Sequence, residues 1–263
     1  MSTEPSRRDH ALLFVTAPYA NQLPLAHFIP TVEPRARLVT VPRPSDVPAR
    51  LADGSADAAL LPVAELARRP DLVAIDGLGV CAAQRARSVL LKCRVPRPDV
   101  RTVACDPASL TSNVLARVLF SHLWKQPVRF VAPDGVPTAD AAVMIGDPAL
   151  LAAPSQGGDV DLASAWHALT GLPFVFAVWA HRRGHPDAAE LARIVRAAKE
   201  AGVAALPELA ARVAADLGLP PDACLDYFTT CIHFDVGPAE RAAMQQFGRL
   251  IADLASRDEE HHP

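Results

Sequence analysis

A regular alternation of short apolar runs with amphipathic stretches constrains the fold of this chain most strongly. The short runs lie between residues 11 and 151 and read ALLFVT, RARLVTVP, DAALLPVAELA, VRTVACD, PVRFVAP and DAAVMIGDPALL. Amphipathic stretches separate several of them, and from Thr111 to Trp124 apolar residues recur at helical spacing. Strands that alternate with helices predict an α/β architecture. The last third of the chain is Ala-rich and helical in pattern, so no strand is expected there.

Composition and charge exclude several classes of protein. A formal net charge of -3 provides no basic field for nucleic acid. The longest apolar stretch, Gly171 to Ala180, is too short to span a bilayer. The five cysteines are widely spaced without a C-x-x-C pair, so neither a disulfide framework nor a metal site is expected. The opening MSTEPSRRDH lacks the apolar segment of a signal peptide and is expected to be a loose leader of a cytoplasmic protein.

Two extended apolar segments suggest a chain of two lobes. ARSVLLKCRVP (residues 86–96) and GLPFVFAVWAHR (residues 171–182) are each long enough to connect lobes and together would form a hinge. We expect residues 1–92 and 178–263 to form the first lobe and residues 93–177 to form the second. A small ligand would then bind in the cleft between the lobes.

The loop PYANQLPL (Pro18 to Leu25) directly follows the first predicted strand. Pro18 and Asn21 suit an ordinary turn, and Pro24 suits the first turn of a helix. Taken alone, this stretch is most simply explained as a turn. A second interpretation, that Asn21 is presented to a ligand, depends on the rest of the chain.

The segment CDPASLTSNVL (Cys105 to Leu115) brings three hydroxyl side chains to the start of a predicted helix. Free amides at a helix start attract anions, and Ser109, Thr111 and Ser112 could add hydroxyl donors for a carboxylate or a phosphate. Helix capping is the alternative, and it explains one hydroxyl better than three. The residues alone leave both interpretations open.

The stretch AAVMIGDPALL ends a predicted strand in Gly146 and Asp147, and Pro148 follows. Proline favours the first helical position, so Asp147 is predicted to cap a helix. A role as general acid or base would need a partner, and no second carboxylate stands at a telling spacing. The structural role is therefore favoured, although a place in the cleft would still let Asp147 contact a substrate.

Together these stretches resemble the chorismate dehydratase family of the futalosine route to menaquinone. The similarity rests on YANQLPL, SVLL (residues 88–91), SLTSNVL (residues 109–115), IGDPAL (residues 145–150) and DLASAWHALTGLPFVFAVWA (residues 161–180). It covers about residues 18–180. Ala20 stands where the family has leucine, and Pro62 and Val63 stand where the family often has a serine pair, so no site residue is assigned to that last loop. The Cys-Pro-Asn-Asp opening of a related enzyme, which makes dihydroxynaphthoate later in the route, is absent.

The resemblance implies a type II periplasmic-binding-protein-like fold and a cytoplasmic hydro-lyase. This enzyme would convert chorismate to 3-[(1-carboxyvinyl)oxy]benzoate and water, without a metal or another cofactor. It implies Asn21 as the catalytic residue that orients the reacting groups, since a carboxamide takes no proton at pH 7. The substrate's own enolpyruvyl carboxylate would be the base, with Asp147 as the rival base. The residues expected to bind substrate are Ser88, Ser109, Thr111, Ser112, Gly146 and Asp147.

Two other functions share these features. A cytoplasmic or exported solute-binding protein for a small carboxylate would have the same fold, because fold alone does not decide function. A related enzyme of the same route with another substrate would differ only in its pocket. We expect no nucleic-acid or membrane partner, and a monomer or a homodimer.

Overall fold

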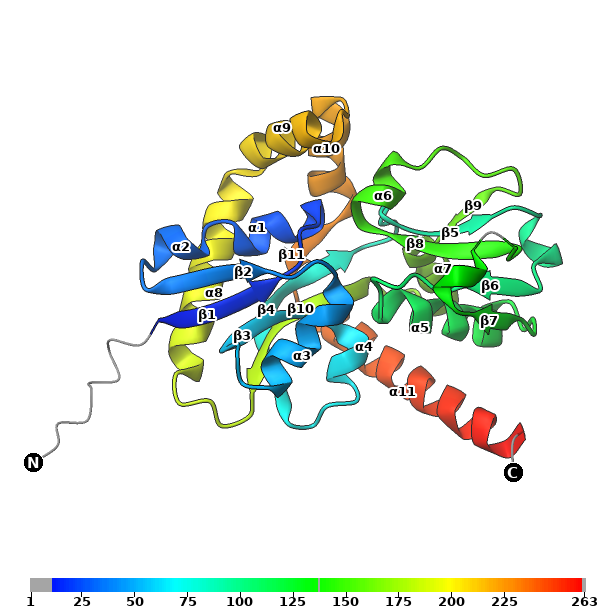
Figure 1. Ribbon diagram of the computed structural model, residues 1–263, viewed down its shortest axis with the longest axis horizontal. Coiled ribbons are helices and arrows are strands. Elements are labelled where there is room, and N and C mark those ends of the chain that lie inside the picture. Colours follow the sequence, from blue (N-terminus) through cyan, green and yellow to red (C-terminus); the bar gives the residue numbers. More distant parts are fainter. Residues whose placement is uncertain (1–10, 137, 262–263) are drawn as a thin grey trace, which may run out of the picture.

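The computed structural model describes residues 11–136 and 138–261, with side chains described to Ser256, and the expected leader at residues 1–10 lies outside this range. The described chain forms two α/β lobes, each built on its own sheet (Figure 1). The larger sheet has the order β11-β4-β10-β3-β1-β2. Its strands are β1 (Leu12–Thr16), β2 (Ala36–Thr40), β3 (Ala58–Pro62), β4 (Leu72–Ala82), β10 (Phe174–Arg182) and β11 (His233–Asp235). The smaller sheet has the order β7-β6-β8-β5-β9. Its strands are β5 (Val89–Cys93), β6 (Thr102–Ala104), β7 (Arg129–Val131), β8 (Ala141–Ile145) and β9 (Asp159–Asp161).

In each sheet, an antiparallel strand lies beside a point where the chain crosses between the lobes. β10 lies antiparallel between β3 and β4, while β1 pairs in parallel with β2 and β3. β5 lies antiparallel between β8 and β9, while β6 pairs in parallel with β7 and β8. All of β5 thus belongs to the smaller sheet and all of β10 to the larger one. The proposed lobe limits place residues 89–92 in the first lobe and residues 174–177 in the second. The sheets instead include residues 89–92 in the smaller sheet, of the second lobe, and residues 174–177 in the larger sheet, of the first lobe.

Helices cover both sheets and fill the last third of the chain. In the first lobe they are α1 (Leu23–Ala26), α2 (Ile29–Val32), α3 (Val47–Ala52), α4 (Val63–Leu66), α8 (Ala188–Ala204), α9 (Leu206–Leu217), α10 (Pro221–Asp226) and α11 (Pro238–His261). In the second lobe they are α5 (Thr111–Val118), α6 (Gly146–Leu151) and α7 (Leu162–Thr170). Four 3₁₀ turns are η2 (Ala20–Gln22), η3 (Pro44–Asp46), η4 (Arg97–Asp99) and η6 (Pro133–Gly135), and η5 (Leu119–Leu123) and η7 (Tyr227–Cys231) are π-helical.

The apolar runs form strands because their alternate residues are buried on opposite faces of the larger sheet. Phe14 and Leu60 belong to the same buried cluster as Leu25 of α1 and Ile29 of α2. Val15 belongs to a separate cluster on the other face of the sheet, which α3 covers. Side chains on a strand alternate between faces, so a strand covered on both sides is apolar throughout. The α/β architecture predicted from these runs is confirmed, as is the helix over residues 111–124, which forms as α5 and η5.

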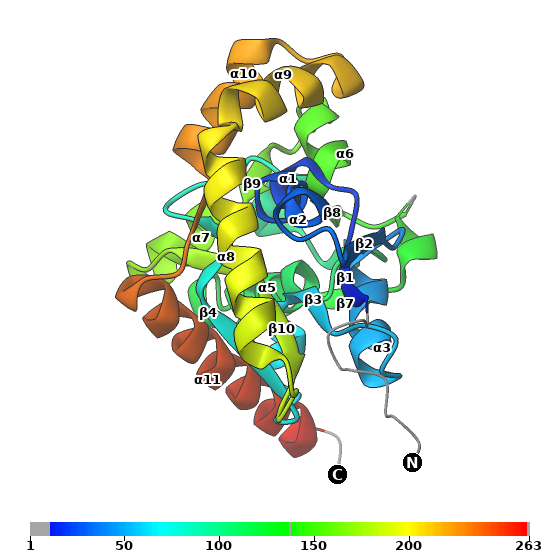
Figure 2. The ribbon, with the colours of Figure 1, turned by 90° about the vertical axis from the view of Figure 1, so that its left-hand side faces the viewer.

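The prediction that the last third contains no strand is wrong. The short strand β11 (His233–Asp235) pairs antiparallel with β4 and forms the edge of the larger sheet. Only three residues long and interrupted by a register shift, it offers too short an alternation for a sequence pattern to reveal. After it, α11 runs from the first lobe along the second and contacts both β10 and α5 (Figures 1 and 2).

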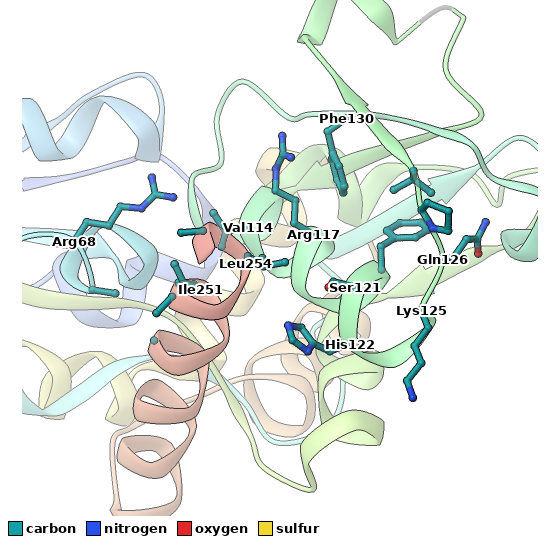
Figure 3. Close-up of a pocket in the computed structure, with 17 residues that line it drawn as sticks. Arg68, Val114, Arg117, Ser121, His122, Lys125, Gln126, Phe130, Ile251 and Leu254 are labelled. Atoms are coloured by element: carbon teal, nitrogen blue, oxygen red, sulfur yellow. The ribbon is translucent and has the colours of Figure 1, made fainter. Parts of the chain in front are cut away.

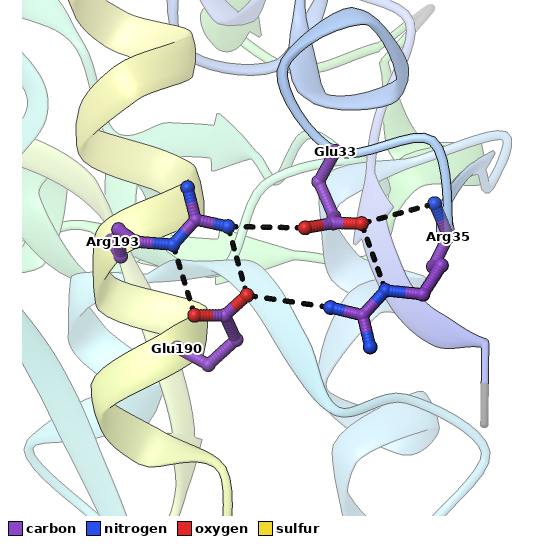
Figure 4. A network of polar contacts seen from close by, with 4 residues as sticks. All are labelled: Glu33, Arg35, Glu190 and Arg193. Carbon is purple, nitrogen blue, oxygen red and sulfur yellow. Dashed lines mark hydrogen bonds and ion pairs between the residues drawn. The ribbon is translucent and has the colours of Figure 1, made fainter. Parts of the chain in front are cut away.

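The long helix α8 packs closely on α1 at a glycine. A Cβ atom on Gly202 would lie 2.0 Å from the carbonyl oxygen of Pro24, so only glycine allows this approach. Beyond this contact, a network of four charged residues joins α8 to the chain around α2 and β2 (Figure 4). Arg193 contacts Glu33 at 3.0 Å and Glu190 at 2.8 Å, and Arg35 contacts the same two carboxylates at 3.0 and 3.5 Å. Hydrogen bonds from Arg35 hold the pKa of Glu33 below its ordinary value.

Candidate active site between the lobes

The loop that carries Asn21 is fixed by a buried glutamine. After β1 the chain turns through η2, and the Gln22 side chain folds back to accept hydrogen bonds from the Thr16 hydroxyl and, at 2.9 Å, from the Ala17 amide. Pro24 then lies in the first turn of α1, as its position in the sequence predicts. The Gln22 side chain thus stabilises the turn through these two hydrogen bonds. The neighbouring Asn21 carboxamide is not needed for them and is available for another role.

Two contacts join this loop to the second lobe. Gly146 has a φ of +67°, and a Cβ atom there would lie 2.7 Å from the Tyr19 ring, so glycine is required by both its backbone and its neighbour. The Asp147 carboxylate accepts a hydrogen bond from the Ala20 amide at 2.9 Å. The prediction that Asp147 caps its own helix is wrong: α6 begins at Gly146, Asp147 lies inside its first turn, and the carboxylate bonds across the lobes instead.

The three hydroxyls at the start of α5 have different surroundings. Ser109 Oγ accepts a hydrogen bond from the Ser112 amide at 2.9 Å and so satisfies one free N–H of the helix start. The Thr111 hydroxyl donates to the Phe176 carbonyl at 3.2 Å and accepts from the Ala64 amide at 3.3 Å, which ties α5 to the first lobe. Within residues 11–136 and 138–261, the Ser112 hydroxyl makes no hydrogen bond, although the residue is buried. The helix-start interpretation therefore accounts for Ser109 but not for Ser112.

These elements enclose a small cavity of about 50 Å³ between the lobes. Five of the seven predicted site residues line it: Asn21, Ser109, Thr111, Ser112 and Gly146. The remaining wall is mostly apolar and includes Tyr19, Leu60, Pro62, Val80, Val89, Ile145 and Phe176. Pro62 thus contributes a ring where the family that this sequence resembles often has a hydroxyl.

The Asn21 Oδ1 atom is buried and accepts no hydrogen bond from the described residues. An unpaired buried acceptor is costly in a folded protein and marks a position where a ligand can supply the missing donor.

The other two predicted residues lie just outside this cavity. Ser88 is buried and forms a 2.7 Å hydrogen bond with the hydroxyl of Tyr227, at the start of η7. Asp147 lines a second cavity of about 320 Å³ on the other side of the η2 loop, and Gln22 also lines this cavity. Burial raises the pKa of Asp147 above its ordinary value, and the hydrogen bond from Ala20 offsets part of this rise.

Sequence reasoning missed two polar groups at this site. Asp106, two residues after the end of β6, accepts hydrogen bonds from the Ala108 amide at 2.8 Å and the Ile145 amide at 3.0 Å, and so joins the loop that follows β6 to the end of β8. Its position close to the end of a strand, inside CDPASL, was a usable signal. Tyr227 comes from the helical third, more than a hundred residues from Ser88, and no spacing in the sequence connects them.

A more spacious hollow of the described chain lies elsewhere. It is a groove of about 1,100 Å³ between α5, η5 and α11, lined by Arg68, Val114, Arg117, His122, Lys125, Phe130, Ile251 and neighbouring residues (Figure 3). None of the seven predicted site residues lines it. The cavity that contains Asn21 is the better candidate site because polar and apolar groups from both lobes converge there.

Two α/β lobes joined by two crossings of the chain, with an antiparallel strand after each crossing and a cavity between the lobes, define a periplasmic-binding-protein fold of type II, which confirms the fold predicted from the sequence. A protein from Archaeoglobus fulgidus of known crystal structure superimposes with a TM-score of 0.71 at 12% identity, covering 93% of this chain and 97% of that one. The periplasmic aliphatic sulphonate binding protein of Escherichia coli superimposes with a TM-score of 0.62 at 19% identity, covering 94% and 93%.

The chain belongs to the menaquinone biosynthesis family, whose model matches residues 16–253. The chorismate dehydratase of Thermus thermophilus is 28% identical over 255 residues, which span 89% of this chain and 92% of that protein. The chorismate dehydratase of Campylobacter jejuni is 40% identical over 124 residues, or 46% of this chain and 43% of that protein. The family resemblance noted in the sequence is therefore confirmed. No helix among residues 11–136 and 138–261 has the length and apolar character needed to cross a membrane.

Proposed function

We propose that this protein is a hydro-lyase that converts chorismate to 3-[(1-carboxyvinyl)oxy]benzoate and water. The reaction removes the ring hydroxyl and the hydrogen on the adjacent carbon, which bears the enolpyruvyl ether, and the C–H electron pair completes an aromatic ring. Two chorismate dehydratases among its relatives support the assignment, and the buried, unpaired Asn21 Oδ1 in the interlobe cavity carries it. Such a biosynthetic enzyme is expected to work in the cytoplasm.

Binding of the substrate's two carboxylates would depend on neutral donors. No lysine or arginine lines the cavity among the described residues, but the unpaired Ser112 hydroxyl is available there. Hydrogen bonds from neutral donors to a carboxylate are charge-assisted and suit a site closed to water. Ser109, Thr111 and Gly146 would shape this pocket, with Thr111 and Gly146 also at contacts between the lobes.

The cavity must widen to admit a substrate. At about 50 Å³ it is far below the roughly 300–1,000 Å³ of ordinary ligand pockets. The contacts that close it, from Tyr19 to Gly146 and from Ala20 to Asp147, join loops of different lobes. We therefore propose that the lobes part to bind chorismate and close on it, which would exclude water during the elimination.

The base in this proposal is the substrate's enolpyruvyl carboxylate. The rival, Asp147, is engaged by the Ala20 amide and lines the second cavity, on the other side of the η2 loop from the cavity of Asn21. Asn21 would hold the reacting carboxylate through its Nδ2–H groups or accept a hydrogen bond from the departing hydroxyl at Oδ1. Both roles fit a carboxamide, which orients groups without exchanging protons.

Replacement of Asp147 with asparagine distinguishes the two bases. The asparagine Oδ1 can still accept the Ala20 hydrogen bond, so we expect kcat to stay within about tenfold of the wild type, whereas loss of a general base costs roughly 10² to 10⁴-fold. The substitution should also remove the contribution of Asp147 to the pH dependence of the free energy of unfolding. Because burial raises the folded-state pKa of Asp147, the wild type loses stability as the pH rises from the unfolded pKa through the folded one. A decrease in kcat of a thousandfold in a folded variant would instead make Asp147 the base.

The proposed function is tested with purified protein and chorismate alone, in buffer that contains a metal chelator. We expect an aromatic product lighter than chorismate by one water, followed by mass and by the change in ultraviolet absorption as the cyclohexadiene becomes a benzene ring. Asn21→Ala protein, prepared in parallel, excludes a contaminating enzyme. Chorismate that binds but is recovered unchanged would identify a solute-binding protein. Failure to bind would point to another substrate of the same family.

A further inference from the structure

Tyr227, a buried residue of the C-terminal helical segment, contacts residues of the predicted site. Tyr227 is 2% exposed, and its hydroxyl lies 2.7 Å from Ser88 Oγ, with Asn21 and Asp147 near enough to influence its ionisation. It is the first residue of η7, and π-helical turns often occur at functional sites because the wider turn redirects side chains. Tyr227 thereby joins the last third of the chain to a polar cluster between the lobes.

The direction of the hydrogen bond determines what Ser88 can do. The Tyr227 hydroxyl donates its single proton to Ser88 Oγ, so the Ser88 hydroxyl serves as acceptor in this contact. Ser88 retains one proton of its own, and within residues 11–136 and 138–261 no group accepts it. The Ser88 backbone is also held, since its amide donates to the Ala86 carbonyl at 2.6 Å and its carbonyl accepts from the Gly146 amide at 2.8 Å. Backbone and side chain together fix where this proton can point.

We propose that Tyr227 is a positioning residue for the dehydration, which holds the Ser88 hydroxyl as a proton donor toward the substrate. The inference rests on the proposed function. Burial raises the pKa of Tyr227, so the phenol stays protonated and remains a donor near neutral pH. Without this contact, the Ser88 hydroxyl would be free to turn and to donate elsewhere. Neighbouring Phe228 and other buried aromatic residues would still fill the surrounding core.

Tyr227→Phe removes the donor and keeps the ring. We expect the variant to fold, with kcat lowered about 10- to 100-fold by loss of orientation and KM changed less. The matched control is Thr229→Val in the same π-helical turn. Its hydroxyl donates to the Leu225 carbonyl at 2.8 Å on the exposed side, so its loss removes a comparable hydrogen bond away from Ser88. Thr229→Val should keep the wild-type kcat.

A double-mutant cycle with Ser88→Ala separates positioning from a general structural effect. If Tyr227 acts through Ser88, the Ser88→Ala protein should lose little further kcat when Tyr227→Phe is added. Independent, multiplicative losses would overturn the inference, as would wild-type kcat in folded Tyr227→Phe protein. A wild-type protein that leaves chorismate unchanged would overturn the proposed function and this inference with it. If the wild type dehydrates chorismate but the Ser88→Ala and Tyr227→Phe losses in kcat multiply, the inference about Tyr227 is overturned and the proposed function stands.

Discussion

Replacing Asn21 with alanine is expected to lower kcat by about 10²- to 10³-fold, the usual cost of removing a preorganised polar group from a reacting centre. The fold should persist, because removal of the buried, unsatisfied Asn21 Oδ1 acceptor offsets the loss of the hydrogen bond between the Asn21 side chain and the Tyr227 hydroxyl. Thermal unfolding should therefore show a Tm equal to the wild type or slightly higher. Steady-state rates with chorismate and the unfolding curve provide the two measurements.

A charged replacement at the same position gives a sharper test. Asn21→Asp keeps the size of the side chain but places a carboxylate in a cavity expected to receive a dianion, so chorismate binding should weaken through like-charge repulsion. Gln246→Ala, on the exposed part of α11, is the matched amide control and should retain wild-type rates and binding. Unchanged turnover in Asn21→Ala, or tighter binding in Asn21→Asp, would contradict the role assigned to Asn21.

Substitution of Gly202 with alanine should destabilise the protein strongly, against the usual preference of helices for alanine. The new Cβ would lie 2.0 Å from the Pro24 carbonyl oxygen, an atom of the backbone that no rotamer change can move. Either α8 or α1 must shift, at an expected cost of about 3 kcal/mol, which corresponds to a decrease in Tm of roughly 6 to 12 °C. Thermal or urea-induced unfolding measures the effect.

Gly248 in α11 provides the matched control for this prediction. It too lies within a helix, but a Cβ atom there would meet no atom within 4 Å. Alanine should therefore stabilise this position by about 0.5 to 1 kcal/mol through helix propensity alone. Opposite signs at the two glycines are the expected result. A Gly202→Ala protein as stable as the wild type would show that α1 and α8 are less closely packed than in this structure.

The parts of this architecture that depend on local pattern could be predicted from the sequence. β1 and β8 are apolar runs, and Asn21 in the loop after β1 and Gly146 directly after β8 line the same cavity, as the resemblance implies. Strand burial on both faces makes such runs easy to recognise. The three-residue β11 has no comparable pattern, because it forms only where the edge of β4 is available to it.

Contacts between distant segments could not be predicted in this way. The role of Asp147 depends on the Ala20 amide, which lies in the other lobe, whereas its neighbours in sequence suggest only a helix cap. Ser88 likewise meets Tyr227 through the packing of η7 against the cleft. Local propensity can describe a helix start, but it cannot identify which distant backbone or side chain will occupy the remaining hydrogen-bonding positions.

The insertion of the smaller sheet between two pieces of the larger one also sets an order for folding during synthesis. Residues 89–161 supply every strand of the smaller sheet, so that sheet can form as soon as this continuous stretch has left the ribosome. The larger sheet must wait, because β10 separates β3 from β4 and ends only at Arg182. Until then β3 and β4 present unpaired edges to the surroundings, which is the state in which nascent chains are most prone to aggregate. The second lobe is therefore expected to fold first, and the first lobe, although it begins the chain, to fold last.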